Sequence, residues 1–230
     1  MSQPEAIVWD LDGTLVDSAP DLATALNSVL DMRGFMPHPV KAVRTMIGNG
    51  LGVLVERGFN AVGARPDTAQ LERLVLLVKQ EYNACLTERS RPYPGIVKAL
   101  EQCRALDIPM GVCTNKPEAP ARAILDGLGL SDYFISVIGG DTTNALKPNP
   151  LPLLACLREL GADPAQSLML GDSGVDVAVA RAAGVIIGVV PWGYSSTSVE
   201  KLGADFILRD PQDLHAILSR GPDAITQTVH

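Results

Sequence analysis

The 230-residue chain contains few of the residues that serve in redox, zinc or histidine-assisted chemistry. It has four cysteines and three histidines. The cysteines are scattered singly, without a C-x-x-C pair or a nearby histidine, so the sequence predicts buried free thiols rather than a zinc or disulfide centre. The histidines (His38, His215 and His230) lie far from every other motif, which argues against a Ser-His-Asp hydrolase.

Positive charge and long apolar runs are also scarce. The net charge of -7 disfavours a role on nucleic acid or on a membrane surface. The longest apolar stretch, around Val185 to Trp192, is too short to span a bilayer, and the amino terminus MSQPEA lacks the pattern of a signal peptide. We therefore expect a cytoplasmic protein, monomeric or homodimeric, that binds neither nucleic acid nor membranes.

Hydrophobic periodicity predicts an α/β fold in two parts. Residues 6–9 read as a buried strand, and apolar residues at helical spacing then predict helices over 20–33, 40–46, 51–59 and 68–86, with no β-like run before Pro109. After Gly95, strands at 109–113, 135–139, 167–171, 185–190 and 205–208 alternate with helices near 95–106, 117–129, 150–160, 174–183 and 211–219. Alternation predicts a Rossmann-like, doubly wound parallel sheet.

The helical block interrupts this core after its first strand. The sequence thus predicts a catalytic core over residues 1–15 and 93–230 and an inserted α-helical cap domain over residues 16–92. The second crossing contains Pro92, Pro94 and Gly95, which suit a hinge. The tail after Arg220 lacks apolar periodicity and is expected to fray.

Chemically useful side chains follow several of the predicted strands. Asp10 and Asp12 stand two apart where the first strand ends, and the carboxyl ends of parallel strands are where open α/β sheets bind ligands. Taken alone, each of these motifs has an ordinary explanation as a turn, a helix cap or a solvated charge. Their joint occurrence favours a site. The motifs besides Asp10 and Asp12 are Thr114 and Asn115 in TNK, Lys147 before Pro148, and Asp172 and Asp176 in GDSGVD.

The ordered set DLDGT, TN, KP and GDSGVD resembles the four motifs of the haloacid dehalogenase superfamily, and the resemblance covers nearly the whole chain. Within that superfamily the chain is similar to phosphoglycolate phosphatases in residues 17–27, 47–50 and 115–117. The resemblance implies a phosphatase of small phosphorylated metabolites, with 2-phosphoglycolate as the expected substrate. Asp12 favours this over the dehalogenases, which lack the second carboxylate.

The clustered acids predict a Mg²⁺ site, because all-oxygen ligands without Cys or His favour that ion and a cation relieves repulsion among carboxylates. By resemblance, Asp10 and Asp172 bind the metal through side chains and Asp12 through its backbone carbonyl. Asp176 is then a water-mediated or outer ligand.

The two acids that follow the first strand have different expected roles in catalysis. Asp10 is the expected nucleophile that forms an aspartyl-phosphate, and Asp12 the expected general acid and base. Thr114 and the backbone N–H of Asn115 are expected to hold a phosphoryl oxygen, while Lys147 offsets negative charge.

The segment RTMIGNG, residues 44–50, is a candidate for substrate recognition by the cap. Its Gly-x-Gly spacing is not preceded by a strand, which disfavours a nucleotide-binding loop. Arg44, Asn49 and the backbone N–H of Gly50 are candidates for binding a substrate carboxylate, although a solvated Arg44 in a plain turn explains the pattern equally well.

Two alternative functions remain open from the sequence. A sugar-phosphate phosphatase or phosphomutase of the same superfamily shares these core motifs. A phospho-accepting receiver module also gathers acids, a Thr and a Lys around an Asp, although the large cap and Asp12 argue against it.

Overall fold

The computed structural model describes residues 3–48 and 50–220. It divides into two compact units, one spanning Met1–Val16 and Pro92–His230 and the other Asp17–Arg91. Asn49 and the predicted fraying after Arg220 lie outside the described residues. Among the helices that are described, none combines the length and the apolar character needed to cross a bilayer.

The larger unit is built on a six-stranded sheet with the order β5-β4-β1-β6-β7-β8. All neighbouring strands run parallel, which confirms the predicted fold class. From β1 the chain proceeds through β4 to β5, then returns with β6 on the opposite side of β1. The strand order therefore reverses between β1 and β6, and such a switch point is where α/β sheets bind ligands. The strands are β1 (Ile7–Trp9), β4 (Met110–Cys113), β5 (Ser136–Ile138), β6 (Leu168–Gly171), β7 (Ile186–Val189) and β8 (Phe206–Ile207).

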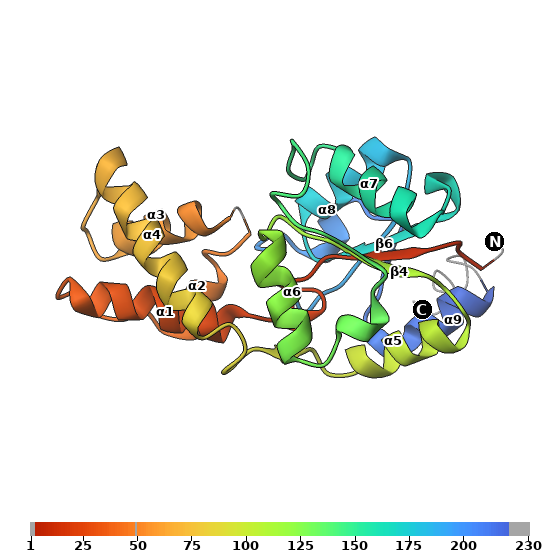
Figure 1. Ribbon diagram of the computed structural model, residues 1–230, viewed down its shortest axis with the longest axis horizontal. Coiled ribbons are helices and arrows are strands. Elements are labelled where there is room, and N and C mark those ends of the chain that lie inside the picture. The colour runs from red at the N-terminus through yellow and green to blue at the C-terminus, as the bar shows by residue number, and fades with distance from the viewer. Residues whose placement is uncertain (1–2, 49, 221–230) are drawn as a thin grey trace. The chain divides into compact units, whose positions relative to one another are not determined.

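Helices cover both faces of this sheet. In Figure 1, α7 and α8 lie on one side of the strands, and α5 and α9 lie on the other. The helices of this unit are α5 (Ile96–Ala105), α6 (Glu118–Gly127), α7 (Leu151–Leu160), α8 (Gly174–Ala183) and α9 (Leu214–Arg220). Short 3₁₀ turns occur at Ser131–Tyr133, Pro164–Gln166, Val199–Lys201 and Pro211–Asp213, so the last predicted helix begins as a 3₁₀ turn.

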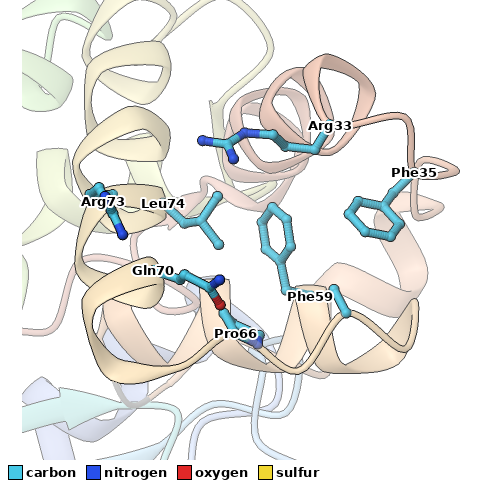
Figure 2. Close-up of a pocket in the computed structure, with 8 residues that line it drawn as sticks. Arg33, Phe35, Phe59, Pro66, Gln70, Arg73 and Leu74 are labelled. Atoms are coloured by element: carbon cyan, nitrogen blue, oxygen red, sulfur yellow. The ribbon is translucent and has the colours of Figure 1, made fainter.

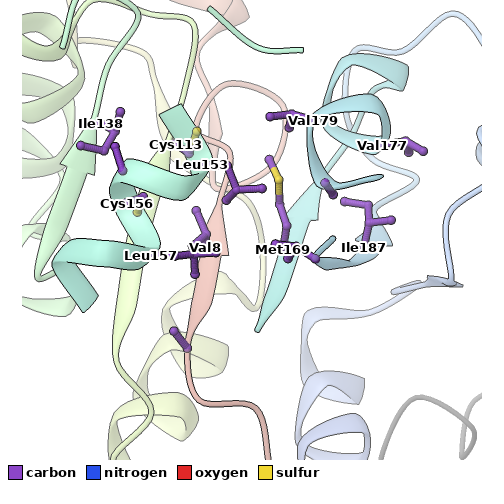
Figure 3. Packing of buried hydrophobic residues seen from close by; sticks show 14 of the residues in the cluster. Val8, Cys113, Ile138, Leu153, Cys156, Leu157, Met169, Val177, Val179 and Ile187 are labelled. Atoms are coloured by element: carbon purple, nitrogen blue, oxygen red, sulfur yellow. The ribbon is translucent and has the colours of Figure 1, made fainter. Parts of the chain in front are cut away.

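The core between the sheet and α7 and α8 anchors the strand ends. Val8 and Met169 are neighbours in register on β1 and β6, and both are fully buried. Figure 3 shows them packed with Leu153 and Leu157 of α7 and Ile187 of β7. Full burial of such a side chain contributes about 1.5–3 kcal/mol. The residues that follow β1 and β6 are therefore carried on a rigid base.

The smaller unit is helical. It contains α1 (Ala19–Met32), α2 (Val40–Arg44), α3 (Leu51–Ala61) and α4 (Thr68–Ala84). One face of α1, including Leu22, Leu26 and Val29, is buried, and α1 and α3 both pack against α4. A hollow of about 490 Å³ opens beside α4, and Phe59 and Leu74 line it together with Arg33 and Arg73 (Figure 2).

Two short strands occur where the chain passes between the units. β2 (Val16–Asp17) pairs with β3 (Arg91–Pro92) in a two-stranded sheet. Our expectation that no β segment lies between the first strand and Pro109 is therefore wrong. Strands of two residues are too short to show an alternation of apolar and polar residues in the sequence.

A buried acid ties the two ends of the helical unit together. The Asp21 carboxylate is fully buried near the start of α1. It accepts hydrogen bonds from the backbone N–H of Arg89 (2.9 Å) and from the N–H and hydroxyl of Ser90 (2.7 and 2.6 Å). Arg89 and Ser90 follow Asp21 by 68 and 69 positions, so these bonds hold the end of the helical unit against its beginning.

Candidate active site

The loop after β1 presents two carboxylates from a tight turn. The Asp10 N–H donates to the Leu170 carbonyl of β6 (2.8 Å), which ties the end of β1 to the switch point. Gly13 then turns the chain at φ +89°, and a Cβ at this position would lie 2.6 Å from Oδ2 of Asp172. Position 13 therefore requires glycine, both for its backbone conformation and for the close approach of the Asp172 side chain.

Lys147 joins two of the predicted acids. Its Nζ donates to Oδ1 of Asp10 (2.8 Å) and to Oδ1 of Asp176 (2.6 Å), and only 3% of its side chain is exposed. Burial alone lowers the pKa of the ammonium, but the charges of the two carboxylates outweigh burial and hold the pKa above its ordinary value. Lys147 is therefore a fixed cation at neutral pH.

Three acids from two segments, the loop after β1 and the GDSGVD run that begins at the end of β6, converge around this lysine. Asp10, Asp172 and Asp176 each offer one oxygen, and these oxygens lie within 4.8 Å of one another. Oδ2 of Asp172 accepts from the Tyr194 N–H (2.6 Å). Oδ2 of Asp176 accepts from the N–H and hydroxyl of Ser173 (3.1 and 2.6 Å), at the start of α8. Each carboxylate is thus held in a defined orientation.

The acids resist ionisation in this setting. Burial raises the pKa of Asp172 to about 8, and the negative charges of Asp176 and Asp10 act in the same direction. Burial also raises the pKa of Asp10, to about 6, although Lys147 opposes the change. A second positive charge in the cluster would favour the ionised forms of both acids.

A divalent metal ion fits this donor set. The clustered ligands are all carboxylate oxygens, which suit a hard cation such as Mg²⁺. Both oxygens of Asp176 already accept hydrogen bonds, from Lys147 and Ser173, whereas Asp10 and Asp172 each bond through one oxygen within the described part of the chain. Asp10 and Asp172 are therefore better placed than Asp176 to ligate directly.

The loop after β4 carries Thr114, Asn115 and Lys116. The Thr114 side chain is buried, and its hydroxyl accepts a hydrogen bond from the Lys116 N–H (3.2 Å). The Asn115 side chain donates to the Lys147 carbonyl (3.0 Å) and accepts from its N–H (2.8 Å). The amide of Asn115 therefore positions the backbone of Lys147, a role that sequence reasoning did not anticipate.

Sequence reasoning also missed Lys116 as a site residue. Its Nζ lies 2.8 Å from Oδ2 of Asp12, and its side chain is 8% exposed. The available signal was its place in the TNK run, directly after two predicted site residues. Asp12 and Lys116 are 104 positions apart, so their contact depends on the pairing of β1 with β4.

The candidate residues of the helical unit lie in and after α2. Arg44, the last residue of α2, forms an ion pair with Asp17, and Gly50 precedes α3 at φ +86°. Asn49, between them, lies outside the described residues.

Comparisons with known proteins place this site in a family context. Residues 4–184 match the sequence model of haloacid dehalogenase-like hydrolases, which is more than half of the chain. The phosphoglycolate phosphatase of Rhodospirillum rubrum is 46% identical over 212 residues, covering 90% of this chain and 88% of that protein. The phosphoglycolate phosphatase of Caulobacter vibrioides is 41% identical over 208 residues, with the same coverage of 90% and 88%.

Solved structures agree with these relatives. A crystal structure described as a predicted phosphoglycolate phosphatase from Haemophilus somnus matches with a TM-score of 0.87 and 31% identity. The match covers 94% of this chain and 99% of that one. The similarity therefore extends over both units rather than over the parallel sheet alone.

Proposed function

The chain belongs to the haloacid dehalogenase-like hydrolase family, and from this membership we propose that it is a Mg²⁺-dependent phosphatase whose substrate is 2-phosphoglycolate. The observation that carries the proposal is the buried cluster in which Lys147 bonds Asp10 and Asp176 beside Asp172. The relatives named as phosphoglycolate phosphatases support the choice of substrate. Free buried cysteines, as the sequence predicts, suit a reducing compartment, and we propose action in the cytoplasm.

The side chains of Asp10 and Asp172 and the backbone carbonyl of Asp12 would hold the Mg²⁺ ion, with Asp176 as an outer ligand. When bound, the ion neutralises the carboxylates and withdraws charge from the phosphoryl group. Lys147 supplies a second, permanent positive charge beside Asp10. This charge favours the ionised form of Asp10, which a nucleophile requires.

Asp10 attacks phosphorus through a carboxylate oxygen, and the bond between phosphorus and the ester oxygen breaks. Asp12 donates a proton to that departing oxygen, which yields an alcohol and an aspartyl-phosphate. Asp12, now ionised, takes a proton from a water molecule that attacks the same phosphorus. Inorganic phosphate leaves and Asp10 is regenerated.

The remaining core residues bind rather than react. The Thr114 hydroxyl and the Asn115 N–H hold phosphoryl oxygens, and Lys147 offsets their charge during transfer. The hydrogen bonds between the Asn115 side chain and the Lys147 backbone support this role, since they fix the two loops to each other. Most of the catalytic effect then comes from positioned charge.

We propose that the unit spanning Asp17–Arg91 acts as a cap over the substrate. Arg44, Asn49 and the N–H of Gly50 are its proposed substrate-binding groups. Because Arg44 pairs with Asp17, an approaching substrate carboxylate would have to compete with that acid.

Metal chelation and phosphoenzyme trapping test these roles. EDTA should abolish turnover and Mg²⁺ should restore it. Asp10→Asn should form no labelled phosphoenzyme, whereas Asp12→Asn retains the nucleophile and should form it slowly and hydrolyse it slowly. A normal covalent intermediate in Asp10→Asn would show that the nucleophile is another residue. A requirement for a bisphosphate primer with hexose phosphates would instead identify a phosphomutase.

A further inference from the structure

The ammonium of Lys116 is held beside the reacting end of the site. Its side chain is 8% exposed, and a lysine is rarely so buried unless a charge partner is present. The partner is Asp12, at 2.8 Å. The lysine therefore sits next to the group that, under the proposed function, gives its proton to the leaving group.

The backbone that carries Lys116 is fixed. The Lys116 carbonyl accepts a hydrogen bond from the Gly140 N–H (2.8 Å), and its own N–H donates to the Thr114 hydroxyl. A Cβ at Gly140 would lie 2.4 Å from the Asn115 carbonyl oxygen, so only glycine allows this contact. Lys116 is consequently preorganised, as a selective binding group needs to be.

We propose that Lys116 binds the carboxylate of the substrate, so that the catalytic unit itself selects phosphate esters of small hydroxy acids. The inference rests on the proposed phosphatase function and deepens it. In such an ester the carboxylate is separated from the leaving oxygen by a single carbon atom. A cation bonded to the acid that protonates this oxygen is therefore within reach of the carboxylate.

One ammonium can serve two carboxylates in this fold. Lys147 does so with Asp10 and Asp176, at 2.8 and 2.6 Å. Lys116 would likewise hold Asp12 and the substrate carboxylate together. The two lysines would then have separate roles. Lys147 offsets the negative charge around phosphorus, and Lys116 offsets the negative charge of the carboxylate on the leaving group.

The test compares two esters that differ in one group. 2-Phosphoglycolate and ethyl phosphate both release a two-carbon alcohol, and only the first carries a carboxylate. The measured quantity is the ratio of their kcat/KM values in wild type and in Lys116→Met. A ratio within one variant does not depend on the fraction of folded protein, and damage to Asp12 lowers both values.

We expect the Lys116→Met ratio to fall about 10- to 100-fold, the scale of a hydrogen bond to a charged group. Inhibition of ethyl phosphate turnover by glycolate should weaken in parallel, and Lys116→Arg should recover part of the preference. Lys98→Met removes an exposed cation of the same unit, whose Nζ bonds Gln212, and should leave the ratio unchanged.

Two outcomes would overturn the inference. An unchanged ratio in Lys116→Met would mean that the lysine serves Asp12 alone, and a ratio that falls only in Arg44→Gln would assign the carboxylate to the helical unit. Failure of the proposed function looks different. In that case the wild type would hydrolyse neither ester, or would show no preference for 2-phosphoglycolate before any residue is changed.

Discussion

Replacing Asp172 by Asn removes a buried acid from the candidate active site, and we expect the metal-free variant to be more stable than the wild type at high pH. The pKa of Asp172 is raised from 3.8 to about 8, by burial and then by the charges of Asp176 and Asp10. Between these pH values the folded protein holds a proton that the unfolded chain has lost. The free energy of unfolding therefore falls as the pH rises from about 4 to about 8.

The magnitude follows from the same values. The folded and unfolded pKa values of Asp172 differ, and at about 1.4 kcal/mol per pKa unit this difference limits the loss in the free energy of unfolding to about 6 kcal/mol. Relaxation of the charged site and entry of water reduce this cost, so we expect a gain of about 1–3 kcal/mol for Asp172→Asn at pH 9. The Asn side chain retains an oxygen that can accept the hydrogen bond from the Tyr194 N–H, so no partner is lost.

Urea unfolding followed by circular dichroism, in EDTA at pH 6 and pH 9, measures this effect. At pH 6, about midway between the unfolded and folded pKa values of Asp172, the wild type has lost about half of this stability, so the variant should gain about half as much as at pH 9. Adding Mg²⁺ at pH 9 should stabilise the wild type and not the variant, because a ligand stabilises the state that binds it. Asp132→Asn, at an exposed acid, controls for net charge. A variant that is no more stable at pH 9, or a difference independent of pH, would refute the reasoning.

Three further predictions concern glycine, a buried acid and the thiols. Gly13→Ala places a Cβ 2.6 Å from Asp172 Oδ2 in a residue whose φ is +89°. It should lower the stability by about 1–3 kcal/mol in thermal unfolding and remove most of the phosphate-releasing activity. Full activity would contradict the requirement for glycine in this turn. Asp21→Ala strands the buried Ser90 donors and should cost about 3–5 kcal/mol in urea unfolding, against a near-neutral change for the exposed Asp31→Ala. Burial raises the pKa of the four thiols to about 11 or 12, so the native protein should react with Ellman's reagent at pH 8 only after denaturation; rapid native reaction would show that the thiols are accessible.

The parallel sheet and the convergence of the acids were predictable from the sequence. Continuous apolar runs mark strands that are covered on both faces, and Asp10 and Asp172 follow two such runs directly. Once the strands are parallel and adjacent, the residues after them must meet. Lys147 follows no strand directly, and its place at the acids was expected from family resemblance alone.

Contacts between side chains of distant loops were not predictable in this way. The pairs Asn115 with Lys147 and Lys116 with Asp12 depend on loop conformations that hydrophobic spacing does not encode. The strands β2 and β3 escaped for a related reason, since two residues show no periodicity. Asn49 lies outside the described residues, and its role stays a prediction.

Phosphate release from 2-phosphoglycolate tests the central claim most directly. The purified wild-type protein should release many equivalents of phosphate per protein molecule with Mg²⁺, and none after exhaustive chelation with EDTA. Asp10→Asn, assayed beside it with Mg²⁺, should release none. Multiple turnovers by Asp10→Asn, or undiminished turnover by the chelated wild type, would contradict a metal-dependent phosphatase with Asp10 as its nucleophile.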